Sequence, residues 1–245
     1  MRPQGGYLIT GGGDPLTGEY NLLEQRLLFA SGGRVLFLVT EEVRELAQAW
    51  REVYARVLGA KATGLVVVKS REVALDRVLA RRVAEARLVW LASRAPHALL
   101  DRLRDTPLLK ALAAVVAAGG HLGAFGETSA ALGATAPLPE GERTAFAYGL
   151  ALLPGVVAFP GFERPGSFEA LAQATAAQPD LTGVGLPRGS ALGVDLEGNA
   201  RVLQGRVTRL GASTSQVHHH SIRGLVADLL AAGERFKLPV YRPGA

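Results

Sequence analysis

Residues 119–132 read GGHLGAFGETSAAL, an apolar run that passes through a short polar step into small residues. This is the order of a nucleophile elbow: a strand, a sharp turn, a serine and a helix. We expect His121–Gly126 to be the strand and Ser129 to be the candidate nucleophile. An elbow normally has glycine two residues before and two residues after its serine, whereas this chain has Glu127 and Ala131 there. The stretch predicts the outline of a catalytic serine without its usual glycines.

Outward from this stretch, apolar runs typical of strands alternate with amphipathic runs typical of helices. The expected strands of the first half are residues 7–10, 34–40, 64–69, 87–92 and 121–126, and the expected helices are 19–30, 40–58, 71–86, one that Pro96 opens and one from about 105 to 118. Alternation of this kind indicates βαβ units in a parallel sheet. We predict a single α/β domain over residues 1–245, with a three-layer, mostly parallel open sheet.

The second half has shorter apolar runs. Expected here are a Pro-rich loop over 133–143, an apolar block over 148–159, a helix over 167–177, strands at 183–186 and 207–210, a hairpin of 191–194 with 201–203, and a terminal helix over 221–232. The chain offers no internal repeat and no linker that would divide it.

Composition limits the classes of function. The chain has 245 residues, 48% of them apolar, and no cysteine, so disulfides and thiolate metal sites are excluded. No apolar run reaches the roughly 18 residues of a membrane span, and the N-terminal residues lack a signal-peptide layout, so a cytoplasmic location and no membrane partner are expected. Scarce Met and Asn and absent Cys suggest a thermophilic source.

The formal net charge of +5 is modest for this length. Basic residues such as Arg77 and Arg81 alternate with acids such as Asp76 and Glu85, which favours a solvated helix face over a nucleic-acid patch. We expect no nucleic-acid partner.

Three loops are predicted to meet at one edge of the sheet, because ligand sites of open parallel sheets form outside the carboxyl ends of the strands. They are Gly11–Asp14, Ser93–His97 and Glu127–Ser129. The amides of Gly12 and Gly13 could receive an oxyanion or phosphate, or simply form a tight turn. The segment is neither a G-x-G-x-x-G fingerprint nor followed by a Walker lysine, so no cofactor is expected.

A catalytic serine needs a base, usually histidine. His97 is the only histidine expected at the ligand edge, and its alternative is a surface helix residue. His121 lies at the other end of its strand, up to roughly 26 Å from Ser129. His218 and His220 would share one face of a strand and are weak candidates for metal ligands. We therefore expect no bound metal.

Four segments resemble the cyanophycinase and dipeptidase E family of serine peptidases, over most of the chain. Its G-T-S-A-G-A motif is similar to Glu127–Leu132, its G-L-G-L-L-P-G block to Gly149–Gly155, its G-x-G-I-D-E-x-T-A stretch to Gly183–Ala191, and its V-x-G-x-G-x-V pattern to Val202–Val207. The resemblance implies a flavodoxin-like fold of the class I glutamine amidotransferase type, with the nucleophile after the fifth strand. It also implies a small peptide-like ligand.

The departures from this family fall on its chemistry. Gly161 stands where the family's D-Q-H-F-x-x-R stretch has its histidine, although Arg164 keeps the arginine. Ser93 and Arg94 replace glycines after the fourth strand, and Pro187-Arg188 replaces the D-E pair. The orienting acid, for which Glu140 and Glu142 are the only choices between Ser129 and the G-L-G-L-L-P-G block, is not assigned.

Two classes of function stay open. The first is a serine hydrolase of peptide or isopeptide bonds with lost or altered catalysis. Its expected site comprises Ser129 as nucleophile, His97 as a non-standard base, and Gly12, Gly13, Ala130, Ser93, Glu127 and Arg164 as oxyanion or substrate contacts. The second is a non-catalytic module that binds a small ligand or assembles, for instance as a homodimer.

Overall fold

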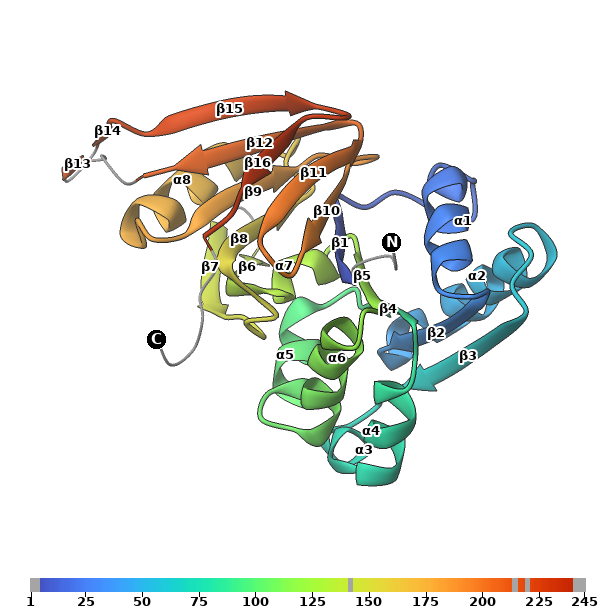
Figure 1. Ribbon diagram of the computed structural model, residues 1–245. Helices are drawn as coiled ribbons and strands as arrows, with labels where there is room; N and C mark the ends of the chain where they lie inside the picture. The colour runs from blue at the N-terminus through green and yellow to red at the C-terminus, as the bar shows by residue number, and fades with distance from the viewer. Residues whose placement is uncertain (1–4, 141–142, 213–215, 219–220, 240–245) are drawn as a thin grey trace.

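The computed structural model describes residues 5–140, 143–212, 216–218 and 221–239. Two mixed sheets and eight α-helices build the fold of this part of the chain (Figure 1). The helices are α1 (Asn21–Ala30), α2 (Arg44–Arg56), α3 (Arg71–Leu75), α4 (Arg77–Ala84), α5 (Pro96–Leu103), α6 (Pro107–Ala117), α7 (Thr128–Ala131) and α8 (Ser167–Ala177), with a 3-10 turn, η1, at Glu41–Val43.

The larger sheet has eight strands. In spatial order they are β16 (Arg235–Lys237), β11 (Asn199–Gln204), β10 (Ala191–Asp195), β1 (Gly6–Thr10), β5 (His121–Phe125), β4 (Leu88–Ala92), β2 (Arg34–Val39) and β3 (Ala62–Val67). The five strands β1 to β5 run parallel, as predicted. β10, β11 and β16 extend this sheet in antiparallel fashion.

The smaller sheet has six strands. In spatial order they are β15 (Val226–Ala231), β12 (Arg206–Gly211), β9 (Thr182–Leu186), β8 (Leu153–Pro160), β6 (Gly133–Glu140) and β7 (Arg143–Tyr148). Only β6, β8 and β9 are parallel to one another. The prediction of a single, mostly parallel sheet was therefore wrong. A separate hairpin joins β13 (Gln216–His218) to β14 (Ser221–Arg223).

The core follows from the apolar runs. Phe37, Leu38 and Val39 of β2 have no exposed surface, as expected for a strand covered on both faces. One face packs on Trp50 and Tyr54 of α2, which lie one helical turn apart and point to the same side. The other face carries α3 to α6 (Figure 1), and its apolar cluster continues into the smaller sheet.

Two predicted segments differ from the structure. The expected Pro-rich loop contains β6, which pairs with β8 only at Gly133 and Thr135. Pro137 and Pro139 therefore have a single neighbouring strand, β7, and proline is tolerated where one side of a strand is unpaired. The expected terminal helix is instead β14 and β15. β15 pairs with β12 along its whole length, and this pairing outweighs the helical preference of its leucines and alanines.

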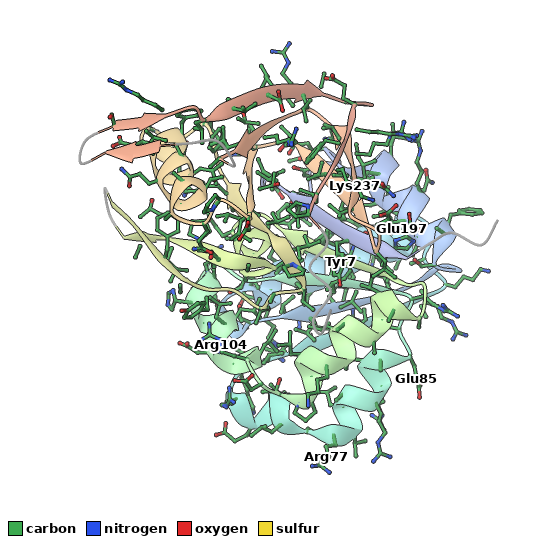
Figure 2. The ribbon with its side chains drawn as sticks, turned by 60° about the vertical axis from the view of Figure 1, so that its left-hand side comes forward. Tyr7, Arg77, Glu85, Arg104, Glu197 and Lys237 are labelled. Atoms are coloured by element: carbon green, nitrogen blue, oxygen red, sulfur yellow. The ribbon has the colours of Figure 1, made fainter. Side chains whose placement is uncertain are left out.

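Charged side chains are exposed on and beside α4. In Figure 2, Arg77 at the start of α4 and Glu85, which directly follows the end of α4, extend outward from the ribbon. Among the residues that the structure describes, no helix is long and apolar enough to cross a bilayer.

Candidate functional site

A cleft of about 340 Å³ lies at the carboxyl ends of strands from both sheets. Its walls come from the loops after β1, β4, β5, β8 and β9 and from the start of α2. The lining residues are Gly11, Gly12, Gly13, Val43, Leu46, Ala92, Ser93, Arg94, Phe125, Gly126, Glu127, Gly161, Glu163, Arg164 and Arg188. The position is the one at which open α/β sheets bind ligands, and all three predicted loops contribute to it.

A second cavity, of about 370 Å³, lies elsewhere in the fold, around Tyr7, Leu153 and Leu238. Its lining is mostly apolar, with Asp195 as its charged member. Tyr7, which contributes to this lining, is labelled in Figure 2. Because it lacks convergent polar groups, we take the cleft at the strand ends as the candidate site.

The sharp turn between β5 and α7 is made by Gly126. Its φ is +57°, the left-handed conformation that connects the strand directly to the helix. In a nucleophile elbow this strained turn carries the nucleophile. The structure thus corrects the expected position: the residue at the turn is Gly126, three residues before Ser129. A Cβ added at Gly126 would meet only the Cα of Gly12, at 3.4 Å, so the floor of the cleft consists of backbone.

Ser129 is part of the core instead of the cleft. Its side chain has no exposed surface. The hydroxyl lies 2.8 Å from the carbonyl oxygen of Thr10 and 3.0 Å from that of Ala124, to which it can donate, and it accepts from the amide of Thr10 at 3.0 Å. These bonds join the ends of β1 and β5. This is the geometry of a small polar residue whose hydroxyl satisfies backbone groups beside the start of a helix.

His97 and Ala130 do not line the cleft. His97 is exposed on α5, the surface position that was the alternative to a catalytic base. Ala130 is fully buried in α7, and its amide donates to the carbonyl oxygen of Glu127 at 3.2 Å, so this amide is not available to an oxyanion. No histidine contributes to the lining among the described residues. His121 is half-buried in β5, and burial lowers its pKa.

Ser93 lines the cleft and fixes the loop after β4. Its amide donates to Thr128 Oγ1 at 2.7 Å, and its hydroxyl lies 3.1 Å from Glu42 Oε1. The Ser93 hydroxyl also accepts from the amide of Ala95 at 3.1 Å. The side chain is buried, so its part in the cleft is to position the residue that follows it, Arg94.

Glu127 and Arg164 form an ion pair within the cleft, with 3.0 Å between Oε1 and Nη1. Arg164 also donates from Nη2 to the carbonyl oxygen of Pro160 at 2.8 Å and from Nε to that of Gly161 at 3.1 Å. All three guanidinium nitrogens therefore have partners. The pair joins the loop after β8 to the turn after β5, and both residues line the cleft.

The glycine loop after β1 is fixed from behind. The carbonyl oxygen of Gly12 accepts from the amide of Gly189 at 2.9 Å and from the hydroxyl of Tyr20 at 2.8 Å. Gly12 and Gly13 have φ values of +93° and +152°, and both line the cleft. Their amides have no hydrogen-bond partner in the described part of the chain. Two backbone donors are thus left beside the cleft.

The histidine run offers no described metal centre. His220 lies outside the described residues, and of His218 only the backbone, in β13, is described. Within residues 5–140, 143–212, 216–218 and 221–239, no group of three or more His, Asp or Glu side chains could hold a metal ion.

Sequence reasoning did not single out several lining residues, among them Gly126, Glu163, Arg94 and Arg188. Each lies within three residues of the carboxyl end of a strand, and this position was the signal that could have identified them. Arg94 belongs to one of the three loops expected at this edge but was not named as a contact, and Arg188 was noted only as a departure from a family pattern.

Neither a protein-family model nor a curated protein sequence matches the chain. Solved structures do match. A peptidase from an acI-B1 actinobacterium superposes with a TM-score of 0.74 at 20% sequence identity, covering 97% of this chain and 98% of that one. A putative Peptidase E protein from Listeria monocytogenes EGD-e superposes with a TM-score of 0.52 at 12% identity, covering 92% and 98%. The chain therefore has an α/β fold shared with solved peptidases.

Proposed function

We propose that this chain uses the cleft to hold a small peptide-like ligand and does not cleave it through a serine nucleophile. The observation that carries the proposal is the glycine at the turn after β5. Gly126 has no side chain to present to the cleft, while Thr128 and Ser129, the next two hydroxyl-bearing residues along the chain, are both fully buried. Loss of the nucleophile alone lowers the rate of a serine peptidase by about 10⁶-fold.

The surroundings of the turn support binding without hydrolysis. The described lining contains no histidine, and the carboxylate of Glu127 is paired with Arg164 at 3.0 Å instead of standing free as a base. What the cleft does offer is backbone amides, both signs of charge and the apolar side chains of Val43, Leu46 and Phe125. A peptide needs this combination of partners.

We infer further that the chain is a diverged relative of the cyanophycinase and dipeptidase E peptidases, built on the class I glutamine amidotransferase layout. A neighbour described as a putative Peptidase E has the same fold. The Gly149–Gly155 segment, which resembles the family's Leu-Leu-Pro-Gly block, leads into β8, whose carboxyl end reaches the cleft. The turn after the fifth strand supports the same origin.

Covalent labelling tests the absence of a serine nucleophile. We expect the wild-type protein to remain unlabelled by a fluorophosphonate probe under conditions that label an active serine peptidase. Peptide mass spectrometry locates any label that forms, and Ser129→Ala and His97→Ala are the controls. Labelling of Ser129 in the folded wild type, lost in Ser129→Ala and reduced in His97→Ala, would establish the hydrolase instead.

Calorimetric titration tests binding. We expect saturable binding of short peptides, including trialanine blocked at both ends, with the peptide recovered intact. Leu46→Trp narrows the cleft from α2 and should weaken binding. Leu22→Trp is its control, because Leu22 is 76% exposed on α1 and does not line the cleft. Equal losses in both variants, or no saturation in the wild type, would contradict the proposed site.

A further inference from the structure

The charges that line the cleft are unequal. Five charged side chains are present: Arg94, Glu127, Glu163, Arg164 and Arg188. Glu127 and Arg164 neutralise each other across 3.0 Å. Two arginines, Arg94 and Arg188, then face a single further carboxylate, that of Glu163. The lining that a ligand meets is therefore positive on balance.

The Arg94 and Arg188 guanidinium groups have no hydrogen bond or ion pair to the described residues. Their backbones, in contrast, are anchored. Arg94 follows Ser93, whose amide donates to Thr128 Oγ1 at 2.7 Å. The amide of Arg188 donates to Glu163 Oε2 at 3.0 Å, and the next amide, that of Gly189, donates to Gly12. Two free cations are thus carried on fixed loops at the same cleft.

Neither Glu163 nor Glu19, the acids near these arginines, forms an ion pair with them among the described residues. One oxygen of Glu163 is engaged with the Arg188 amide. The Glu19 carboxylate does not line the cleft and lies close to the backbone of two glycines. A Cβ added to Gly13 would be 2.2 Å from Glu19 Oε2, and a Cβ added to Gly189 would be 2.4 Å from Glu19 Oε1. The Gly12 and Gly13 amides add two hydrogen-bond donors without an acceptor among the described residues.

We propose that Arg94 and Arg188 form a subsite for an oxyanion, a carboxylate or phosphate group carried by a small ligand. A guanidinium binds such a group through two parallel N–H donors, and backbone amides beside it supply further donors. The subsite rests on the proposed function, because it assigns the anionic part of the ligand that the cleft holds. The rest of the ligand then contacts Val43, Leu46 and Phe125.

Titration of the wild-type protein with inorganic phosphate, with glutarate and with doubly blocked trialanine tests this subsite. We expect saturable binding of at least one of the two anions, weakened by sodium chloride because the arginines are exposed. Arg94→Gln and Arg188→Gln should each weaken anion binding about tenfold, as expected for charge-assisted hydrogen bonds, and the double variant should abolish it. Binding of the neutral peptide should change little.

Arg26→Gln is the matched control, because Arg26 is an exposed arginine on α1 outside the lining. Preference for phosphate or for glutarate identifies which group the subsite takes, and either preference supports it. Anion binding that survives in the double variant, or that falls equally in Arg26→Gln, overturns the subsite. If trialanine binds and neither anion does, the subsite fails and the proposed function stands. If none of the three binds, both fail.

Discussion

Glu24 is a carboxyl group buried among aromatic side chains. It lies on α1 with 1% of its surface exposed. Trp50 donates to its Oε1 at 3.0 Å, while its Oε2 is buried without a hydrogen-bond partner. Burial raises its pKa from the ordinary value of 4.5 to about 7, and the bond from Trp50 opposes this only in part. Near neutral pH the folded protein therefore holds a proton that the unfolded chain has released.

This residue should make stability fall as pH rises. The folded state binds the extra proton between pH 4.5 and about 7, so the contribution of Glu24 to the free energy of unfolding decreases across that window and is constant above it. The full effect is about 3 kcal/mol. Urea denaturation of wild type and Glu24→Gln at pH 5 and pH 8 measures it. We expect the variant to gain stability relative to wild type at pH 8; a pH-independent difference would contradict the assignment.

At the same scale, the sequence indicated the cleft but not its key residue. The Gly-Gly-Gly loop, Glu127 and Arg164 all line the cleft, because loops after parallel strands converge whatever their composition. The sequence pattern placed the turn three residues too late. Residues 126–129, GETS, contain several residues that suit a helix start, and the comparison with the family motif favoured the serine. The backbone conformation identifies Gly126 as the turn residue, because its φ is +57°, and local sequence pattern does not contain this value.

Among the elements, β15 departs most from its local pattern. The segment Val226–Ala231 is rich in leucine and alanine, which favour helix, yet it pairs with β12 from Arg206↔Ala231 to Gly211↔Val226. Arg209 and Asp228, 3.1 Å apart, connect the two strands at their centre. The two strands are near each other in the sequence. Even so, the local pattern does not indicate that the backbone of Val226–Ala231 bonds to β12 instead of forming a helix.

Neighbouring leucines distinguish the two conformations. In β15, Leu230 packs against the main apolar cluster, whereas Leu229 is 65% exposed on the opposite side. Leu230→Ala should lower the free energy of unfolding by about 1–2 kcal/mol, and Leu229→Ala should change it by less than about 0.5 kcal/mol. Urea denaturation of both variants measures the contrast. Similar losses at both positions would exclude the strand.

Across the whole molecule, the sequence predicted the parallel half well and the remainder poorly. β1, β2, β4 and β5 are apolar runs with most of their residues buried, a pattern with few alternatives, and β3 is the partly buried edge strand that pairs with β2. The smaller sheet combines edge strands, prolines and non-sequential neighbours, such as β12 between β9 and β15. These pairings depend on long-range contacts, which local periodicity does not contain.

The two sheets nevertheless share one apolar cluster. It includes Val89 and Leu122 of the larger sheet together with Val156, Val184 and Val207 of the smaller sheet. If one sheet unfolded, the apolar side chains of the other sheet would lose their packing partners. We therefore expect both sheets to unfold in a single cooperative transition.

Two probes test this cooperativity. Trp50 and Trp90 both lie in the cluster beside α2, so intrinsic tryptophan fluorescence follows the larger sheet. Hydrogen exchange of amides in β8 and β9 follows the smaller one. We expect the urea midpoint from fluorescence to coincide with that from far-UV circular dichroism, and the slowest amides of both sheets to report the same free energy of opening. A lower opening energy for β8 and β9 alone would show that the sheet bearing Arg164 and Arg188 at its strand ends opens independently, and the cleft with it.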